Sequence, residues 1–130
     1  MKNLITLTAI FLCATINAQI KTPMPSPISK VEQKIGLTDV SIVYSRPHKR
    51  NREIFGKLVP FDDIWRTGAN KNTIITTSDV LIFDNDTLKP GSYAVFTIPK
   101  KYTWEIIFYA DTNNWGTPRN LEENQEKIIR

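Results

Sequence analysis

The 130-residue chain is poor in the side chains that most enzymes use for catalysis. It contains one cysteine, Cys13, and one histidine, His48. One histidine cannot form a zinc site of several imidazoles, and Cys13 lies in a segment that we expect to be removed. No serine occupies the sharp strand-to-helix turn that holds the nucleophile of many hydrolases. These absences argue against a metal centre and against nucleophilic catalysis, and we expect the protein to need no cofactor.

The N-terminus lacks a run long enough to cross a bilayer. Lys2 precedes an apolar run from Leu4 to Ile16, which is shorter than the roughly 20 residues that a spanning helix needs. A positive charge, a short apolar region and a small residue before the cut are typical of a secretory signal peptide. We therefore expect a signal peptide at residues 1–18, cleaved after Ala18, a secreted or periplasmic mature chain, and no transmembrane segment. An uncleaved anchor is the alternative.

A large surplus of one charge is also missing. The chain has 17 basic and 13 acidic residues, and removal of Lys2 would leave 16 basic residues. So small a surplus does not predict nucleic-acid binding, and an exported protein meets little nucleic acid.

No long segment shows the period of a helix, whereas β patterns recur throughout. Pro23, Pro25 and Pro27 predict an extended leader at residues 19–30, because proline blocks helix and ladder hydrogen bonds. Strand patterns separated by turns predict an all-β protein, an antiparallel β-sandwich forming one domain over residues 31–130. We expect its strands at residues 31–35, 40–44, 73–77, 80–83, 92–99 and 103–109.

The C-terminal part is charged and closes on Ile128-Ile129-Arg130, which resembles the start of a strand. A sandwich needs its last strands to cover the core and close an edge. We therefore expect a fragment that lacks C-terminal strands. A short terminal element is the alternative.

Residues 54–70 form the densest part of the sequence, where two glycines and a proline are surrounded by Phe55, Leu58, Val59, Phe61, Ile64 and Trp65. This composition predicts a packed central loop, a kind of segment that often carries function. We also expect one helical turn at residues 60–66, with Asp62 and Asp63 near its start. Asp84-Asn85-Asp86 lacks the glycine and distal glutamate of a calcium loop and predicts a β-turn.

Six motifs occur in order along the chain: Tyr44-Ser-Arg-Pro47, Ile54-Phe-Gly56, Leu58-Val-Pro60, Trp65-Arg-Thr-Gly-Ala-Asn70, Gly91-Ser-Tyr-Ala-Val-Phe-Thr-Ile-Pro99 and Trp115-Gly116. Together they resemble a family of secreted bacterial proteins known as domain-of-unknown-function family 2911, over residues 26–116. The resemblance implies a fold and a compartment but no mechanism, and it implies that members continue beyond Arg130. The chain departs from the family pattern at Asn51, where glycine is usual.

Four residues are candidates for ligand binding: Arg46, His48, Arg66 and Asn70. Arg46 and His48 belong to a basic run that ends at Arg52, and arginine can hold a phosphate, sulfate or carboxylate group in bidentate fashion. A solvated loop is the alternative for the run. Arg66 and Asn70 end the central loop. Arg66 either faces a ligand or satisfies the loop itself, through backbone carbonyls or through Asp62, Asp63 or Glu53.

These residues favour a non-catalytic module that binds an anionic or sugar-like ligand, such as an anionic glycan, a small anion or an acidic protein. Two other readings stay open. One is an enzyme that uses Arg66 as an electrostatic clamp and Asp62, Asp63 or His48 as proton carrier. The other is an assembly domain whose open sheet edge accepts a partner strand. Three tryptophans and four tyrosines could form the core or stack on sugars.

Overall fold

The computed structural model describes residues 22–83, 86–121, 123 and 128–129. Within these ranges the backbone forms eight strands and no helix, and every pairing between the strands is antiparallel. The predicted all-β fold is thus confirmed. The described residues include no helix that could span a membrane. The signal peptide expected at residues 1–18 lies outside the described part of the chain.

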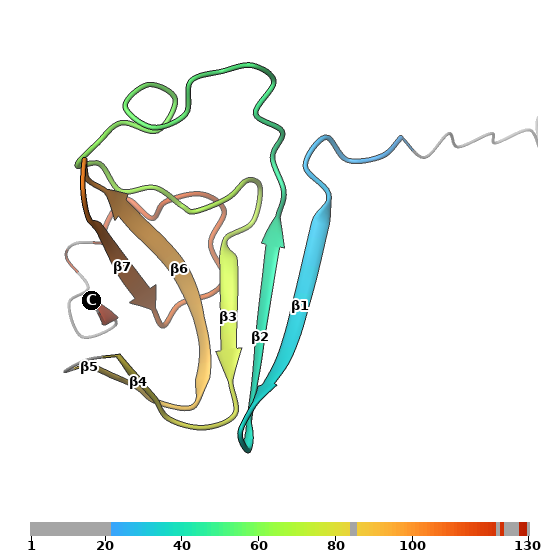
Figure 1. Cartoon of the computed structure of the whole chain (residues 1–130), viewed down its shortest axis with the longest axis vertical. Helices are drawn as coiled ribbons and strands as arrows, with labels where there is room; N and C mark the ends of the chain where they lie inside the picture. The colour runs from blue at the N-terminus through green and yellow to red at the C-terminus, as the bar shows by residue number, and fades with distance from the viewer. Residues whose placement is uncertain (1–21, 84–85, 122, 124–127, 130) are drawn as a thin grey trace, which may run out of the picture.

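Six strands form the main sheet, in the spatial order β1, β2, β3, β6, β7 and β8 (Figure 1). Their bounds are Ile28–Ile35, Thr38–Ser45, Thr73–Thr77, Gly91–Pro99, Trp104–Tyr109 and Ile128–Ile129. β1 begins within the segment that we expected to be an extended leader, because residues from Ile28 onward pair with β2. The expected strand at Ile128 is β8, which pairs with the end of β7.

A second, two-stranded sheet consists of β4 (Leu81–Phe83) and β5 (Asp86–Leu88). It packs on the main sheet through the ring of Phe83, which stacks on Phe108 of β7 with centroids 5.3 Å apart. Leu88 is fully buried. The turn predicted at residues 84–86 falls partly outside the described residues, and its last member, Asp86, is the first residue of β5.

Alternation along β6 and β7 places the core on one face of the main sheet. Ala94 and Phe96 of β6 lie opposite Tyr109 and Ile107 of β7, and all four are buried together with Leu121. Such a period of two is expected for a strand whose two faces meet different surroundings. The opposite face of β7 carries Trp104 and Ile106, which are exposed, and Phe108, which is buried where it stacks on Phe83.

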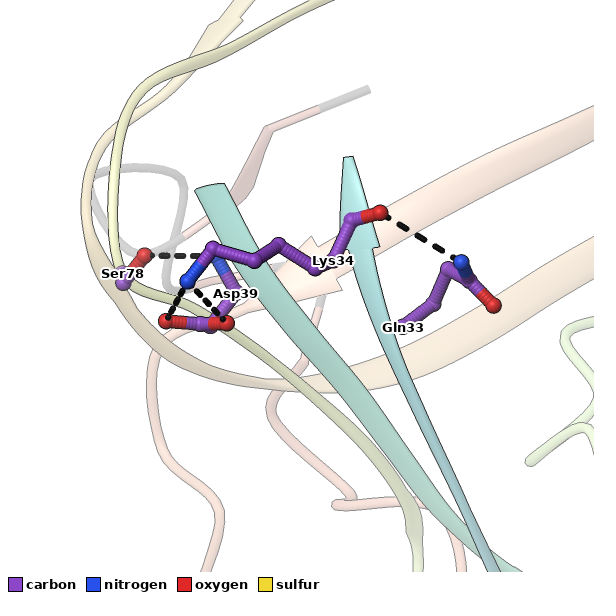
Figure 2. A network of polar contacts seen from close by, with 4 residues as sticks. All are labelled: Gln33, Lys34, Asp39 and Ser78. Atoms are coloured by element: carbon purple, nitrogen blue, oxygen red, sulfur yellow. Dashed lines mark hydrogen bonds and ion pairs between the residues drawn. The ribbon is translucent and has the colours of Figure 1, made fainter. Parts of the chain in front are cut away.

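The β1–β2 hairpin reverses at Gly36 and Leu37, whereas the sequence pattern extended this turn to Asp39. Asp39 is instead a β2 residue that ties the hairpin to the segment after β3 (Figure 2). Its backbone N–H donates to Ser78 Oγ at 2.8 Å, and its carboxylate accepts from Lys34 Nζ at 3.2 Å. Both Lys34 and Asp39 are exposed, so this pair contributes little stability.

The helical turn expected at residues 60–66 is wrong. Asp62 has a φ of 65°, which an α-helix does not accommodate. The backbone N–H of Asp62 donates to Pro99 O at 2.9 Å, and that of Trp65 donates to Thr97 O at 2.8 Å. The segment thus bonds to the end of β6 rather than to itself, a partner that local sequence does not reveal.

Candidate functional site

The long loop between β2 and β3, residues 46–72, is bonded to β6 in one part and to itself in another. Trp65 and Thr97 exchange backbone hydrogen bonds, with Thr97 N donating to Trp65 O at 2.9 Å. Earlier in the loop, Gly56 N donates to Val59 O and Val59 N donates to Ile54 O, both at 2.8 Å. These bonds close the small coil visible above the sheet in Figure 1. The loop is therefore a fixed structure rather than an extended connection.

The apolar side chains of this loop do not all point inward. Val59 is buried, and Ile64 packs partly buried against the core. Phe55, Leu58 and Phe61 remain exposed. The loop is packed on one side and leaves apolar surface on the other.

A groove of about 520 Å³ opens along this loop. Residues of the basic run and of the central loop, residues 54–70, line this groove. Its lining consists of Pro47, His48, Lys49, Arg52, Ile54, Leu58, Val59, Pro60, Asp63, Ile64, Trp65, Arg66, Gly68 and Ala69. Pockets of a few hundred Å³ with mainly apolar walls and a few polar groups are typical of small-molecule sites.

Arg66 is half-buried in the lining. Its Nη1 donates to Asn70 O at 3.3 Å. A guanidinium has five N–H donors, and the other four have no hydrogen-bond partner among the described residues. The ion pairs found within the described ranges do not include Arg66, so its expected pairing with Asp62, Asp63 or Glu53 is not seen there. Arg66 satisfies one loop carbonyl and retains donors for a ligand.

The turn after Arg66 is held by threonine hydroxyls. Thr73 Oγ1 donates to Thr67 O at 2.7 Å, and the hydroxyls of Thr67 and Thr97 lie 3.0 Å apart. The segment ending at Gly116 supports the same region. Asn72 Nδ2 donates to Gly116 O at 2.9 Å, and a Cβ atom at Gly116 would lie 3.6 Å from Arg66 Nη1. The motifs around Trp65 and Trp115 are therefore neighbours in space.

The basic run supplies another part of the lining, through His48, Lys49 and Arg52. Arg52 fastens the run to itself, because its Nε donates to Lys49 O at 2.9 Å and its Nη2 donates to His48 O at 2.7 Å. Asn51 has a φ of 58°. That left-handed conformation suits glycine, and asparagine tolerates it better than most residues. The departure from the family pattern at Asn51 is thus compatible with the backbone that glycine would adopt.

The four sequence candidates divide into two pairs. His48 and Arg66 both line the groove. Arg46 and Asn70 do not belong to the lining. Arg46 is exposed at the end of β2, and its backbone N–H donates to Pro27 O. Asn70 has a φ of 61°, which suits a turn, and its Nδ2 donates to Ser26 O of the N-terminal segment at 3.4 Å.

Sequence reasoning did not select Arg52 and Trp65 as site residues, although both line the groove. Trp65 belongs to an aromatic cluster with Phe55 and Trp104. Its ring centroid lies 6.1 Å from that of Phe55 and 6.2 Å from that of Trp104, in edge-to-face arrangements. Trp104 follows far along the chain on β7, so only the fold brings these rings together. The sequence did offer a signal for Arg52, because it belongs to the basic run.

The fold and the groove define a small antiparallel β protein with one long, structured loop that carries cationic and aromatic groups. A family model described as "Protein of unknown function (DUF2911)" matches residues 26–130. The chain belongs to this family, as its motifs suggested. Searches of curated proteins and of solved structures give no match.

Proposed function

We propose that the protein is an exported, non-catalytic binding module that takes an anionic or sugar-like small molecule into the loop groove. The observation that carries the proposal is Arg66, a half-buried arginine of the groove lining that gives one donor to the loop and whose other donors have no partner among the described residues. Charge-assisted hydrogen bonds from arginine to carboxylate or phosphate are about twice as strong as neutral ones.

Two further features of the groove support this ligand class. Trp65 lies beside Arg66 in the lining, and an indole face can pack against a sugar ring. His48 and Arg52 add polar and cationic groups to the same lining. A volume of about 520 Å³ suits one or two sugar rings. An acidic sugar would use both the cationic and the aromatic parts of this lining.

The N-terminal sequence supports export, since its charge and apolar run are those of a signal peptide. The natural ligand would then be met in the periplasm or outside the cell. Mass spectrometry of the protein recovered from the periplasm of a bacterial host should find Gln19 as the first residue. Retention of residues 1–18 would contradict this part of the proposal.

Binding can be tested by isothermal titration of the mature chain with glucuronate, phosphate and glucose, followed by the same titrations with Arg66→Ala. We expect glucuronate or phosphate to bind, and Arg66→Ala to weaken that binding by about 10- to 100-fold, since a hydrogen bond to a charged group contributes about 1.5–3 kcal/mol. Arg46→Ala is the matched control, because Arg46 is exposed and outside the lining. Equal affinity of the Arg66→Ala variant would remove Arg66 from the site.

The glucose titration separates the two ligand types. Binding of glucuronate and phosphate without glucose indicates an anion site, and binding of both sugars without phosphate indicates a sugar site on Trp65. Failure of all three ligands to bind, with the protein folded, would contradict the proposal for these ligand classes.

An enzyme is the second candidate, and one observation favours it. Asp63 and His48 both line the groove with Arg66, so a proton carrier and an electrostatic clamp share one site. Asp62 does not belong to the lining. Slow turnover of a bound ligand that is abolished by Asp63→Asn, with ligand affinity retained, would favour the enzyme over the binding module.

A further inference from the structure

The outer edge of β1 is long and open. β1 is the first strand of the main sheet, and no described strand lies beyond it (Figure 1). It has eight residues, and Val31 at its middle is 50% exposed. A long edge strand presents unpaired backbone groups and is a template for pairing with another strand. No residue of β1 lines the groove described above.

The hydrogen bonds of the hairpin show which residues of β1 have backbone N–H and C=O groups that point to the free edge of the sheet. Arg46 N donates to Pro27 O, so Pro27 and Arg46 form a hydrogen-bonded pair. Such pairs alternate with non-bonded pairs along an antiparallel ladder, and Ile28 lies opposite Ser45. Odd-numbered residues of β1 therefore bond to β2. The even-numbered residues turn their N–H and C=O groups to the free edge, and these are Ile28, Lys30, Glu32 and Lys34.

If β1 pairs antiparallel with β1 of a second copy, the charges of Lys30 and Glu32 are complementary across the contact. When Val31 of two chains meets on a two-fold axis, Lys30 of each chain lies opposite Glu32 of the other. The two symmetric pairs are of opposite charge, which stabilises cross-strand contacts. Lys30 Nζ and Glu32 Oε1 already lie 2.6 Å apart within one chain, and both side chains are more than half exposed. Neither is committed to the interior.

Neighbouring registers fit less well. Shifting the pairing by one step places Glu32 opposite Glu32 and Lys30 opposite Lys34, which are like charges. A further step also pairs Glu32 with Lys34, but then only residues 31–35 of β1 lie in the ladder, whereas the register centred on Val31 keeps residues 28–34 in it. The first register also places Val31 against Val31, next to Ile42 on β2, which is 36% exposed. Charge pairing and the length of the ladder thus select the register centred on Val31.

We propose that the protein forms a symmetric dimer in which two β1 strands pair antiparallel about Val31 and join the two main sheets into one. Isologous contacts of this type use the same surface twice. The partner is a second copy of this chain. The proposal does not depend on any ligand of the groove.

The test is the oligomeric state of the mature chain, residues 19–130, measured by light scattering after size exclusion and by sedimentation equilibrium. We expect a dimer. Lys30→Glu and Glu32→Lys each turn two attractive pairs into two repulsive ones, and either change should raise the dimer dissociation constant about thirtyfold. The double variant Lys30→Glu/Glu32→Lys restores opposite charges and should return the constant to within about threefold of the starting value.

Lys89→Glu is the matched control, since Lys89 is an exposed lysine between β5 and β6. Circular dichroism spectra should be the same for all variants, because the changed residues are exposed. A monomer at millimolar concentration would overturn the proposal. So would a dimer that the single charge reversals leave intact, or a double variant that stays as weak as the single ones.

Discussion

At the scale of the residue, Arg66 is placed by contacts that come from distant parts of the chain. Asn70 accepts one of its hydrogen bonds, Gly116 lies beside its guanidinium, and the Trp65–Thr97 bridge fixes the backbone just before it. A side chain held in this way loses little further freedom when it binds a ligand, which favours affinity. The site therefore depends on the loop keeping one geometry.

Gly56 is the residue at which that geometry is most sensitive. Its φ is 81°, and a Cβ atom there would lie 2.8 Å from Cε2 of Phe61. We expect Gly56→Ala to lower the free energy of unfolding by about 2–4 kcal/mol, from backbone strain and overpacking together. Gly36→Ala is the control, because Gly36 also has a positive φ but has open space around it.

Gly36→Ala should then cost only about 1 kcal/mol, the conformational part alone. Urea unfolding followed by tryptophan fluorescence measures both variants. Equal losses for the two would show that Phe61 does not pack over Gly56.

At the scale of the element, the alternation of β7 carries the core. Ile106 and Ile107 are adjacent isoleucines on one strand, yet Ile107 is fully buried and Ile106 is 48% exposed. We expect Ile107→Ala to lower the free energy of unfolding by about 2–5 kcal/mol, as for other buried isoleucines, and Ile106→Ala to lower it by about 1 kcal/mol or less. Denaturant titration of the two variants is the measurement. A larger loss at Ile106 would mean that β7 turns its other face to the core.

The elements also show what the sequence could and could not predict. Alternation in the sequence of β6 agrees with the burial of Ala94 and Phe96 on one face, but not with Thr97, a polar residue that is buried on the other face. The three residues of β5 were too few to show a pattern. The helical turn at residues 60–66 was a wrong prediction because the backbone of Asp62 and Trp65 bonds to β6, and propensity does not include such partners.

The candidate site was predictable only in part, for the same reason. Arg66 in the central loop and His48 in the basic run were predicted as site residues because they are cationic or titratable, and both line the groove. Arg46 and Asn70 looked equivalent to them in the sequence. Both lie outside the lining, and which loop residues line the groove depends on the path of the whole loop.

At the scale of the whole molecule, the chain combines an antiparallel sheet with a structured loop at one end and an open strand at one edge (Figure 1). The proposed ligand groove belongs to the loop, and the proposed dimer contact belongs to β1. The two sites share no residue. Dimerisation would therefore present two grooves on one assembly, and a ligand with repeated anionic groups would bind to it more tightly than a single group does.

The most direct test of the binding proposal is a nuclear magnetic resonance titration of the ¹⁵N-labelled mature chain with glucuronate and with phosphate. We expect the largest shifts of amide signals within residues 47–69, together with a shift of the Arg66 side-chain signal. We expect Arg66→Ala to remove the amide shifts. Shifts that gather on another face of the sheet, or shifts in the loop that persist in Arg66→Ala, would contradict the binding proposal.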